Sequence, residues 1–590
     1  MSRHDPHSYA DLTQATIRHI GLDLAIDFDT RQVRGTAHYT LDRPSAGPLD
    51  LDTRGLSIVS IESSGRSLRF ELGDEDTILG TRLRLLDLNG ASSFSIDFAL
   101  SRDASALQWL DGAQTRGGHS PYLYTQCQPL NARSVFPCQD TPSVRFTYDA
   151  ILDIPAPLVA LMAAARDHDE QVGDRRRVRF HMPQPVPSYL FAFAVGNLGA
   201  RDVGPRTCVY TEPEGLDEAA WEFAQTEAMV LAAEKLYGPY LWDRFDLLVL
   251  PPSFPYGGME NPRLTFVSPT IIIGDRSLTD MIAHELAHSW TGNLVTNATW
   301  EELWLNEGWT TYAERRILES LEGKDAAMLH AFSRRLLMIR HIESFGWDSD
   351  PTRLKFSQAG MDPNEVLSQV PYEKGYSFLV RLERVVGRRT FDEFARQYIA
   401  ENRFGTISTE AFLERVRQKL PQAAAEVDLD AWAYQPGFPG DAPSFDTALM
   451  TPVSNLVMSF QAGHMPTRAD VAEWNTTQIT LFLQLLPRVI TPDECRAVER
   501  ALSLNPSSAP IFLGRFYEIA IRSGYREVLE PAKTLISSVG RGFIIYPVFR
   551  AMLASDWCRP EARALLDRVR GRHHPMTIKI MQAMLADEAQ

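Results

Sequence analysis

The order of apolar and polar residues divides the chain into a β-rich part, a mostly helical part and an all-helical part. From residue 15 to about 198, segments such as "ATIRHIGLDLAIDFDTRQVRGTAHYTL" alternate apolar and polar positions and break at turn-forming residues, as strands do. From about 215, "EGLDEAAWEFAQTEAMVLAAEKLYG" has helical periodicity that ends at Gly238, and a short apolar strand, "FDLLVLPP", follows. Beyond residue 455 the pattern predicts a series of helices of about 10 to 15 residues without a fixed repeat.

Between the two helical parts, "QPGFPGDAPSFD" (435–446) is dense in Pro and Gly and predicts an extended linker. A chain of 590 residues is too long for one hydrophobic core, so several domains are expected. The predicted segments are a β-rich N-terminal domain (1–198), a mostly helical domain (199–434), a linker (435–454) and an α-helical C-terminal domain (455–590).

The composition is that of an ordinary globular protein, with 44% hydrophobic and 23% charged residues. The longest apolar run, "APLVALMAAA" (156–165), is half the length that spans a bilayer and predicts a buried strand or loop. A net charge of −16 disfavours binding to nucleic acid or to anionic membranes. Five scattered cysteines and a polar N-terminal segment favour a reducing compartment. We therefore expect a cytoplasmic protein that is a monomer or a weak oligomer.

The segment "MIAHELAHSW" (281–290) fits the pattern H-E-x-x-H with His284, Glu285 and His288. Positions i and i+4 lie on one face of a helix, so both imidazoles can reach one point. Two neutral imidazoles can bind one zinc ion, and the glutamate between them can act on water beside it. Three fixed letters are a weak signal. The alternative is a buried helix whose histidines bond to backbone carbonyls.

Two capping signals frame this segment and the next helix. Ser277 with Asp280 fits a capping box that starts the first helix, and Thr299 with Glu302 fits one that opens "WEELWLNEGWTTYAERRILESL". Glu307 lies in this second helix, nineteen positions after the second histidine. Helices joined by a short connection tend to pack antiparallel, which would let Glu307 face the histidines. Three protein ligands leave a fourth position open, as in a catalytic zinc site.

Several further motifs create a resemblance that covers nearly the whole chain. H-E-x-x-H, followed after eighteen residues by the glutamate of "NEG", resembles the gluzincin signature, and "GGMEN" (257–261) resembles the G-x-M-E-N motif of the aminopeptidase N family. "QCQPLNARSVFPCQDTPSVRFTY" (126–148), "SWTGNLVTNATWEELWLNEG" and "PYEKG" (371–375) are similar to the leukotriene-A-four hydrolase/aminopeptidase branch of that family. The resemblance implies a multidomain α+β fold with a saddle-like β-rich domain, a thermolysin-like, mostly helical catalytic domain and an all-helical C-terminal domain.

The same resemblance implies a zinc aminopeptidase that binds one zinc ion and acts on peptides with free N-termini. The implied catalytic set consists of the metal ligands His284, His288 and Glu307, the general base Glu285, and Tyr372 as donor to the oxyanion of the transition state. Each zinc-binding histidine needs a partner for its other ring nitrogen. Glu314, two turns after Glu307, is a candidate partner, although a solvated helix residue is the commoner role at such a position.

The resemblance further implies a substrate site that measures peptides from the N-terminus. Glu260 would bind the ammonium group with Gln128 as a helper, and two glycines would let the backbone lie against an extended peptide. Arg541 matches the arginine of an Arg-x-Lys pair of the branch and would meet a carboxylate. The full implied set is Gln126, Gln128, Tyr256, Gly257, Gly258, Met259, Glu260, Asn261 and Arg541.

Three positions depart from the branch. Asn364 stands where the branch has an aspartate implicated in epoxide opening, Leu367 where it has a tyrosine, and Phe543 where it has the lysine of the Arg-x-Lys pair. Asparagine carries no negative charge, so we expect weak or absent epoxide hydrolysis and no strong preference for an N-terminal arginine. The missing lysine argues against strong selection for short peptides or for fatty-acid carboxylates.

Three alternatives remain open. An epoxide hydrolase that retains the second activity of the branch is disfavoured by Asn364. A zinc endopeptidase is disfavoured by Glu260, which would block substrates that extend past the N-terminal residue. A catalytically inactive scaffold, whose helical domain binds partners, is disfavoured because the ligands, the base and the tyrosine are all present.

Overall fold

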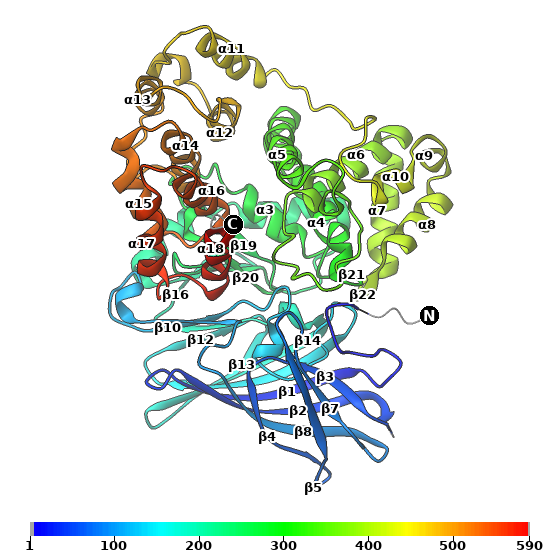
Figure 1. Cartoon of the computed structure of the whole chain (residues 1–590). Coiled ribbons are helices and arrows are strands. Elements are labelled where there is room, and N and C mark those ends of the chain that lie inside the picture. Colours follow the sequence, from blue (N-terminus) through cyan, green and yellow to red (C-terminus); the bar gives the residue numbers. More distant parts are fainter. Residues whose placement is uncertain (1–4, 46, 588–590) are drawn as a thin grey trace.

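The computed structural model describes residues 5–45 and 47–587. In Figure 1 the strands of the first third of the chain form the base, and the central helices and the C-terminal helices stand over it. The predicted α+β fold, with a β-rich first part, a mostly helical centre and an all-helical end, is confirmed. None of the helices in the described part of the chain is long and apolar enough to cross a membrane.

The base is built around an eight-stranded sheet with the order β13-β14-β11-β1-β2-β8-β4-β5. Within β1, residues Ile20, Leu22 and Leu24 are buried while their neighbours are more exposed, which is the alternation that the sequence predicts for a sheet with one covered face. The strands are β1 (Ile17–Asp27), β2 (Gln32–Ser45), β4 (Leu56–Ser63), β5 (Arg66–Ser67), β8 (Ala91–Leu100), β11 (Arg145–Pro155), β13 (Ala165–Val172) and β14 (Arg175–Pro187).

Two smaller sheets pack with it. The predicted apolar segment at 156–165 contains a short strand, β12, that is largely buried. The first small sheet contains β3 (Leu49–Thr53), β7 (Gly80–Leu85) and β6 (Phe70–Asp76), and the second contains β12 (Val159–Met162), β15 (Phe193–Gly196), β10 (Tyr122–Thr125) and β9 (Leu107–Leu110).

A five-stranded sheet, with the order β16-β17-β18-β20-β19, opens the central part of the chain. Its strands are β16 (Gly199–Gly204), β17 (Thr207–Thr211), β18 (Asp246–Val249), β20 (Leu264–Val267) and β19 (Gly258–Met259). The strand predicted in "FDLLVLPP" is confirmed as β18, and all four of its residues are buried. The short strand β19 is antiparallel to β20 and lies at the edge of the sheet, so one side of its backbone is left for another partner.

The central helices begin with a pair where the sequence predicts one helix. The predicted helix does end at Gly238, whose φ is +97°, but it is broken after Glu222 because Phe223 leaves the helical conformation and packs in the core. The central helices are α1 (Leu216–Glu222), α2 (Thr226–Tyr237), α3 (Asp280–Ala287), α4 (Leu303–Glu322), α5 (Lys324–Phe345), α6 (Gly375–Val386), α7 (Arg388–Asn402), α8 (Thr409–Lys419), α9 (Pro421–Glu426) and α10 (Leu429–Tyr434). A two-stranded sheet of β21 (Val295–Asn297) and β22 (Gly405–Ile407) lies among them.

The two predicted capping boxes have different outcomes. The box of Thr299 and Glu302 is confirmed by the bond that the Thr299 backbone N–H donates to Glu302 Oε2 at 3.1 Å, and it opens a 3-10 turn that leads into α4. The box of Ser277 and Asp280 is wrong: α3 starts at Asp280 after Thr279, which makes no side-chain cap bond. The Ser277 hydroxyl instead bonds, at 2.6 Å, to a threonine hydroxyl at the start of α12. The Ser277 hydroxyl, which the local spacing predicts as a helix cap, therefore makes a tertiary contact instead.

Residues 435–449 contain no helix or strand and connect α10 to the C-terminal helices. In Figure 1 this segment is the extended yellow trace that runs to α11. The C-terminal helices are α11 (Met450–Gln461), α12 (Thr476–Leu485), α13 (Pro492–Ala501), α14 (Pro510–Arg522), α15 (Leu529–Ser538), α16 (Gly542–Leu553), α17 (Arg559–Val569) and α18 (Pro575–Asp587). Their buried side chains form a second core, which Leu329 of α5 joins, whereas the β-rich and central parts share the first core.

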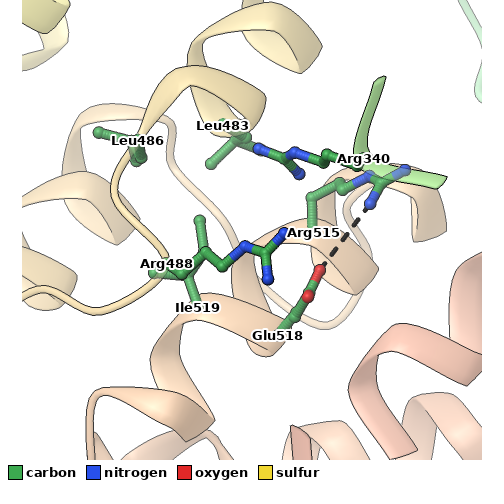
Figure 2. A pocket seen from close by; sticks show the side chains of 7 residues that line it. All are labelled: Arg340, Leu483, Leu486, Arg488, Arg515, Glu518 and Ile519. Carbon is green, nitrogen blue, oxygen red and sulfur yellow. Dashed lines mark ion pairs between the residues drawn. The ribbon is translucent and has the colours of Figure 1, made fainter. Parts of the chain in front are cut away.

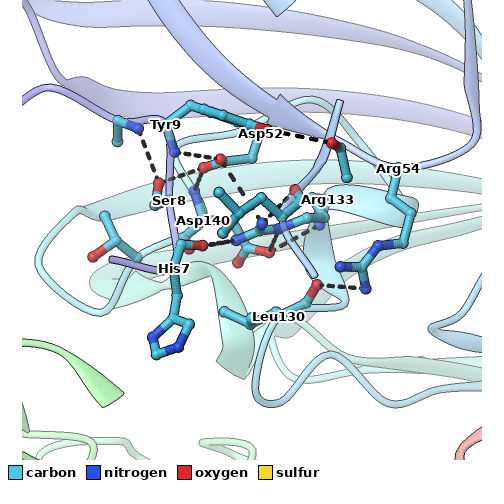
Figure 3. Close-up of polar contacts among 12 residues, drawn as sticks. His7, Ser8, Tyr9, Asp52, Arg54, Leu130, Arg133 and Asp140 are labelled. Atoms are coloured by element: carbon cyan, nitrogen blue, oxygen red, sulfur yellow. Dashed lines mark hydrogen bonds and ion pairs between the residues drawn. The ribbon is translucent and has the colours of Figure 1, made fainter. Parts of the chain in front are cut away.

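A buried ion cluster ties the N-terminal segment to the base (Figure 3). The fully buried guanidinium of Arg133 donates to Asp140 Oδ2 at 2.8 Å and to the carbonyl of His7 at 2.8 Å. Asp52 lies 3.9 Å from the same guanidinium and accepts hydrogen bonds from Ser8 and from the backbone of Asp140. One arginine thus balances two buried carboxylates that have no access to water.

Removal of this charge is expected to be costly. Methionine at position 133 keeps much of the apolar length but leaves Asp52 and Asp140 without their cation, and loss of one partner of a buried ion pair costs roughly 3–5 kcal/mol. We predict that Arg133→Met unfolds at clearly lower urea concentration than the parent in a titration followed by circular dichroism. Arg389→Met, at a side chain that is 95% exposed, is the matched control and should unfold with the parent. Equal midpoints for both variants would contradict the role given to Arg133.

Candidate active site

His284 of α3, His288 at the C-cap of that helix and Glu307 of α4 converge on one point. His284 and His288 have ring centroids 4.8 Å apart. Glu307 Oε2 lies 3.4 Å from His284 Nε2 and 3.5 Å from His288 Nε2. Because α3 and α4 follow each other closely in the chain and pack together, residues nineteen positions apart in the sequence meet.

These donors fit a tetrahedral metal ion. Donors about 2.0–2.2 Å from zinc lie roughly 3.3–3.6 Å from one another, close to the separations observed here. Glu307 Oε2 is buried and has no hydrogen-bond partner among the described residues, so a cation at this point would satisfy it. Burial lowers the pKa of His288 to about 4, which keeps its ring in the neutral form that binds zinc.

Both ring Nδ1 atoms have partners that leave Nε2 facing Glu307. His284 Nδ1 lies 2.9 Å from Glu314 Oε2, so the candidate partner in the sequence does contact this ring. Burial opposes ionisation of Glu314, but the hydrogen bond to His284 lowers its pKa to about 2. His288 Nδ1 lies 3.2 Å from the carbonyl of Thr291 and 3.1 Å from Thr310 Oγ1. Such contacts fix the orientation of a metal-binding imidazole.

Glu285 lies between the candidate metal ligands and the edge strand β19. Its side chain is buried, and its Oε2 has no hydrogen-bond partner among the described residues. A Cβ atom at Gly258 would lie 2.3 Å from Glu285 Oε1, so only glycine allows the strand to come this close to the carboxylate. Burial, reinforced by the charge of Glu307, raises the pKa of Glu285 to about 8. A carboxylate in such a setting can accept and return a proton.

Tyr372 approaches the same centre from a π-helical turn, Val370–Lys374, that precedes α6. Its ring stacks on His284 with centroids 5.9 Å apart. Gly308 of α4 and Gly375 allow this close approach, because a Cβ at Gly375 would lie 2.9 Å from the Gly308 Cα. Burial, with the nearby carboxylate of Glu307, raises the pKa of Tyr372 well above its usual value, so the hydroxyl keeps its proton and can donate it in a hydrogen bond.

Glu260 follows β19 and supplies a further buried carboxylate. Gln128 Nε2 donates to Glu260 Oε1 at 3.1 Å, and Asn293 Nδ2 donates to the Glu260 carbonyl at 2.6 Å. Burial, followed by the charges of Glu307 and Glu285, raises the pKa of Glu260 well above its usual value. A buried carboxylate among other carboxylates favours a cationic ligand such as an ammonium group.

The other sequence-predicted residues surround the strand at different depths. Met259 is buried and accepts a weak hydrogen bond from Gln126 Nε2 at 3.3 Å, on the face of the strand opposite to Gly258. Asn261 is buried, and its Nδ2 has no partner among the described residues. Tyr256 is half-buried, with its hydroxyl 4.0 Å from the sulfur of Met576 in α18. The structure therefore brings Gly258 and Glu260 to the metal ligands, and it brings Gln126 and Met259 together behind the strand.

Arg541 reaches the far end of the same strand from the start of α16. A Cβ at Gly257 would lie 2.6 Å from Arg541 Nη2. Arg541 Nη1 donates to Thr270 Oγ1 at 3.1 Å, and Nε is buried without a partner among the described residues. Arg541 thus lies beside position 257 and Glu285 beside position 258, while Glu260 itself occupies position 260.

Asn364, which stands where the branch has an aspartate, lies beside a carboxylate that is already paired with a cation. Asn364 donates from its backbone and its side chain to Asp362 Oδ1, at 3.0 and 2.9 Å. Asp362 is also paired with Lys579 of α18 at 2.7 Å. Leu367 is exposed. Neither position 364 nor position 367 therefore presents an unpaired carboxylate.

Sequence reasoning missed two residues that support the centre. Thr310 lies one turn after Glu307, and this i+3 spacing was a usable signal for a residue on the same helix face. Asn293 braces the backbone of Glu260 from the loop after α3, and no local spacing indicates that contact because the two residues belong to different elements.

Three protein-family models match successive parts of the chain. The model of the peptidase family M1 domain matches residues 221–432, that of the peptidase M1 N-terminal domain matches residues 5–190, and that of the leukotriene A4 hydrolase C-terminal domain matches residues 474–585. Leucine aminopeptidase 2 of Neosartorya fischeri is 35% identical over 97% of this chain and 96% of the relative. Leukotriene A-4 hydrolase of Xenopus laevis is 37% identical over 97% of this chain and 98% of the relative.

The solved structures include yeast leukotriene A4 hydrolase in complex with bestatin. It superimposes with a TM-score of 0.92 at 31% sequence identity, over 99% of this chain and 97% of the yeast chain. The three matched domain models, the near-complete coverage of the relatives and the shared architecture lead to one assignment. The chain belongs to the M1 family of zinc metallopeptidases, in the branch that contains the leukotriene A-4 hydrolases.

Proposed function

We propose that the chain is a zinc aminopeptidase that removes N-terminal residues from peptides. The observation that carries this proposal is the position of Glu260: a buried carboxylate, bonded to Gln128, belongs to the same cluster as Glu285 and the metal ligands. A carboxylate at a fixed distance from the reacting centre selects a substrate whose ammonium group is near the scissile bond. The aminopeptidase name of the Neosartorya fischeri relative supports the same activity.

His284, His288 and Glu307 would hold one zinc ion, with Glu314 and Thr310 fixing the two rings. When bound, zinc supplies a Lewis acid that polarises a carbonyl and lowers the pKa of water towards neutrality. The buried carboxylates around the site favour a cation there, because three nearby glutamates cannot all ionise without one.

The residues of the chain then carry out the proton transfers. Glu285 accepts a proton from the attacking water and returns it to the amine that leaves. Tyr372 donates a hydrogen bond to the oxyanion that develops on the attacked carbonyl. Glu260 and Gln128 bind the ammonium group, and an extended peptide adds to the open edge of β19, where Gly257 and Gly258 allow close approach.

Epoxide hydrolysis is the second candidate, because a relative that matches 97% of the chain is named leukotriene A-4 hydrolase. Asn364 argues against an efficient reaction of this kind: it cannot provide a negative charge, and the adjacent Asp362 is engaged by Lys579. An endopeptidase is disfavoured by Glu260, which closes the end of the site.

We further propose that the chain works in the cytoplasm on peptides, as a monomer or weak oligomer, and binds neither nucleic acid nor membranes. The net charge of −16 supports the exclusion of polyanionic partners. The five cysteines, all buried and free, are compatible with a reducing compartment.

The aminopeptidase proposal is tested by one short peptide and its N-acetylated twin, each with and without a zinc chelator. We expect cleavage of the free peptide alone, abolished by the chelator and restored by zinc, because acetylation removes the charge that Glu260 binds. Equal cleavage of both peptides would indicate an endopeptidase and remove the role of Glu260. Metal content, measured in parallel by atomic spectroscopy, separates loss of zinc from inhibition.

The base is tested by Glu285→Gln, which keeps the size of the side chain but cannot accept a proton. Turnover is expected to fall by roughly 10²–10⁴-fold or more, while zinc content stays at the parent level. Glu393→Gln, at an exposed helix position, is the control and should retain full turnover. Full turnover of Glu285→Gln with zinc bound would rule out the general-base role.

The oxyanion donor is tested by Tyr372→Phe. The bond forms only in the transition state, so kcat should fall by roughly 10²–10³-fold with little change in KM. Tyr376→Phe is the matched control, because this buried tyrosine packs under the guanidinium of Arg315 and not against the metal ligands. A large rise in KM with unchanged kcat would assign Tyr372 to ground-state binding instead.

A further inference from the structure

The turn that carries Tyr372 has an unusual backbone and depends on its surroundings. Val370–Lys374 is a single π-helical turn, a rare conformation that is frequent at functional sites. It does not share the hydrogen-bond pattern of α6, which follows it, so contacts with other segments must help to set its position. Those contacts therefore decide where the tyrosine hydroxyl lies.

Central helices hold this turn near both of its ends. Glu373 pairs with Arg315 of α4 at 2.5 Å, and both side chains are buried. The backbone N–H of Gln369, just before the turn, donates to Nδ1 of His341 in α5 at 2.9 Å. Arg340, the neighbour of His341 in α5, instead lines a small pocket between α5, α12 and α14 (Figure 2). Consecutive residues of α5 thus serve different parts of the molecule.

Lys374, the last residue of the turn, bonds to two backbone carbonyls. Its side chain is fully buried, and Nζ donates to the Thr352 carbonyl at 3.0 Å and to the Gln435 carbonyl at 2.8 Å. Burial, and then the charge of Arg353, lowers the pKa of Lys374 to about 7. Both the charged and the neutral amine can donate to two carbonyls. Because a buried amine is costly unless it is hydrogen-bonded, these two bonds allow the side chain to lie here.

The second of these bonds joins the turn to the Pro/Gly-rich linker. Gln435 is the first residue after α10, and residues 435–438 are called the linker start below. The backbone N–H of Gly437 donates to Thr352 Oγ1 at 2.8 Å. The linker start is therefore bonded to the same threonine that accepts from Lys374, and these groups form one connected support.

The linker start also packs against the beginning of the turn. Phe438 contacts a small hydrophobic cluster of Val370, Met338 and Ile342, all of which are fully buried. Val370 opens the turn and Lys374 closes it, so the segment that carries the tyrosine meets the linker start at both ends. A segment that the sequence predicts as an extended connection thus also supports the active-site turn.

We propose that Lys374 is a positioning residue for Tyr372: by bonding to Thr352 and to the linker start, it fixes the π-helical turn and with it the position of the tyrosine hydroxyl. This inference rests on the proposed role of Tyr372 as oxyanion donor. A hydrogen bond weakens steeply with poor geometry, and a displacement of about 1 Å can cost roughly 10²-fold in rate. Lys374 acts through the backbone and takes no part in bond cleavage.

The first experiment is a double-mutant cycle with trialanine as substrate. Lys374→Met keeps the length of the side chain and loses both bonds, so kcat should fall about tenfold with KM changed by less than about twofold. In the Tyr372→Phe protein the same change should lower kcat by less than about twofold, because the hydroxyl that Lys374 positions is absent. Independent, additive losses would overturn the inference.

Lys355→Met is the matched control for loss of a buried amine. Lys355 is also buried, but its Nζ donates to Glu302 Oε1 at 2.7 Å and not to a segment that holds the turn. We expect a lower urea midpoint, because a buried ion pair is broken, with kcat close to that of the parent. A fall in kcat equal to that of Lys374→Met would show that lost stability alone explains the effect, and would overturn the inference.

Thr352→Val is the second variant and decides the matter if Lys374→Met does not fold. It keeps the size of the side chain but removes the oxygen that accepts from Gly437, so it loosens the linker start while Lys374 stays in place. We expect kcat to fall about threefold, and this loss to vanish in the Tyr372→Phe protein. The same loss in both backgrounds would contradict the proposal.

The last experiment follows hydrogen exchange of the backbone amides of residues 369–375 in the zinc-loaded protein without substrate. Exchange should be faster in Lys374→Met than in the parent, and unchanged in Lys355→Met. Unchanged exchange in Lys374→Met would overturn the inference. Faster exchange, together with full kcat in Tyr372→Phe, would support the positioning of the turn by Lys374 and assign the failure to the role proposed for Tyr372.

Discussion

The concentration of buried negative charge at one point is the constraint on which the rest of the site depends. Glu260, Glu285, Glu307 and Glu314 are buried within reach of two imidazoles, and carboxylates removed from water are costly unless they are paired. Three of them face a cation or a donor: Glu314 bonds to a histidine ring, Glu260 to an amide, and Glu307 points to the place where a metal ion fits. The proposed chemistry follows from this arrangement, because a site that must hold cations suits both a metal ion and the ammonium end of a substrate.

Rigid elements keep these groups at fixed distances. One helix with its C-cap carries the two histidines and Glu285, the helix packed against it carries Glu307, and a π-helical turn that glycines allow to approach α4 carries Tyr372. The edge strand β19 completes the arrangement, since a peptide can pair with its backbone in a defined direction. Loops alone would not hold charged groups to within the fraction of an ångström that proton transfer requires.

The fold also explains why charge at the junction of the central and C-terminal helices cannot be judged from one motif. In the sequence, Phe543 stands in place of the lysine of an Arg-x-Lys pair, so one cation of the pair is missing. In the structure, Arg334 and Arg515 arrive at the same aromatic ring from α5 and α14. What matters for a ligand is the summed field of nearby groups, and that field is set by helix packing rather than by neighbours in the chain.

Much of the fold and of the site can be predicted from the sequence because the relevant patterns are local. The alternation of apolar and polar residues predicts the strands of the base, and helical periodicity with Gly238 predicts the end of α2. The capping box of Thr299 and Glu302 predicts the start of the turn before α4. The H-E-x-x-H spacing puts two histidines on one helix face whatever surrounds them, and Glu307 follows from the packing of consecutive helices. Only the tertiary structure decided that the Ser277 hydroxyl bonds to α12 instead of capping α3, that Asn293 holds Glu260, and that Arg334 lies beside Phe543. Backbone periodicity depends on residues that are close together in the sequence. These contacts join distant segments and form only once the packing of whole helices has brought the segments together.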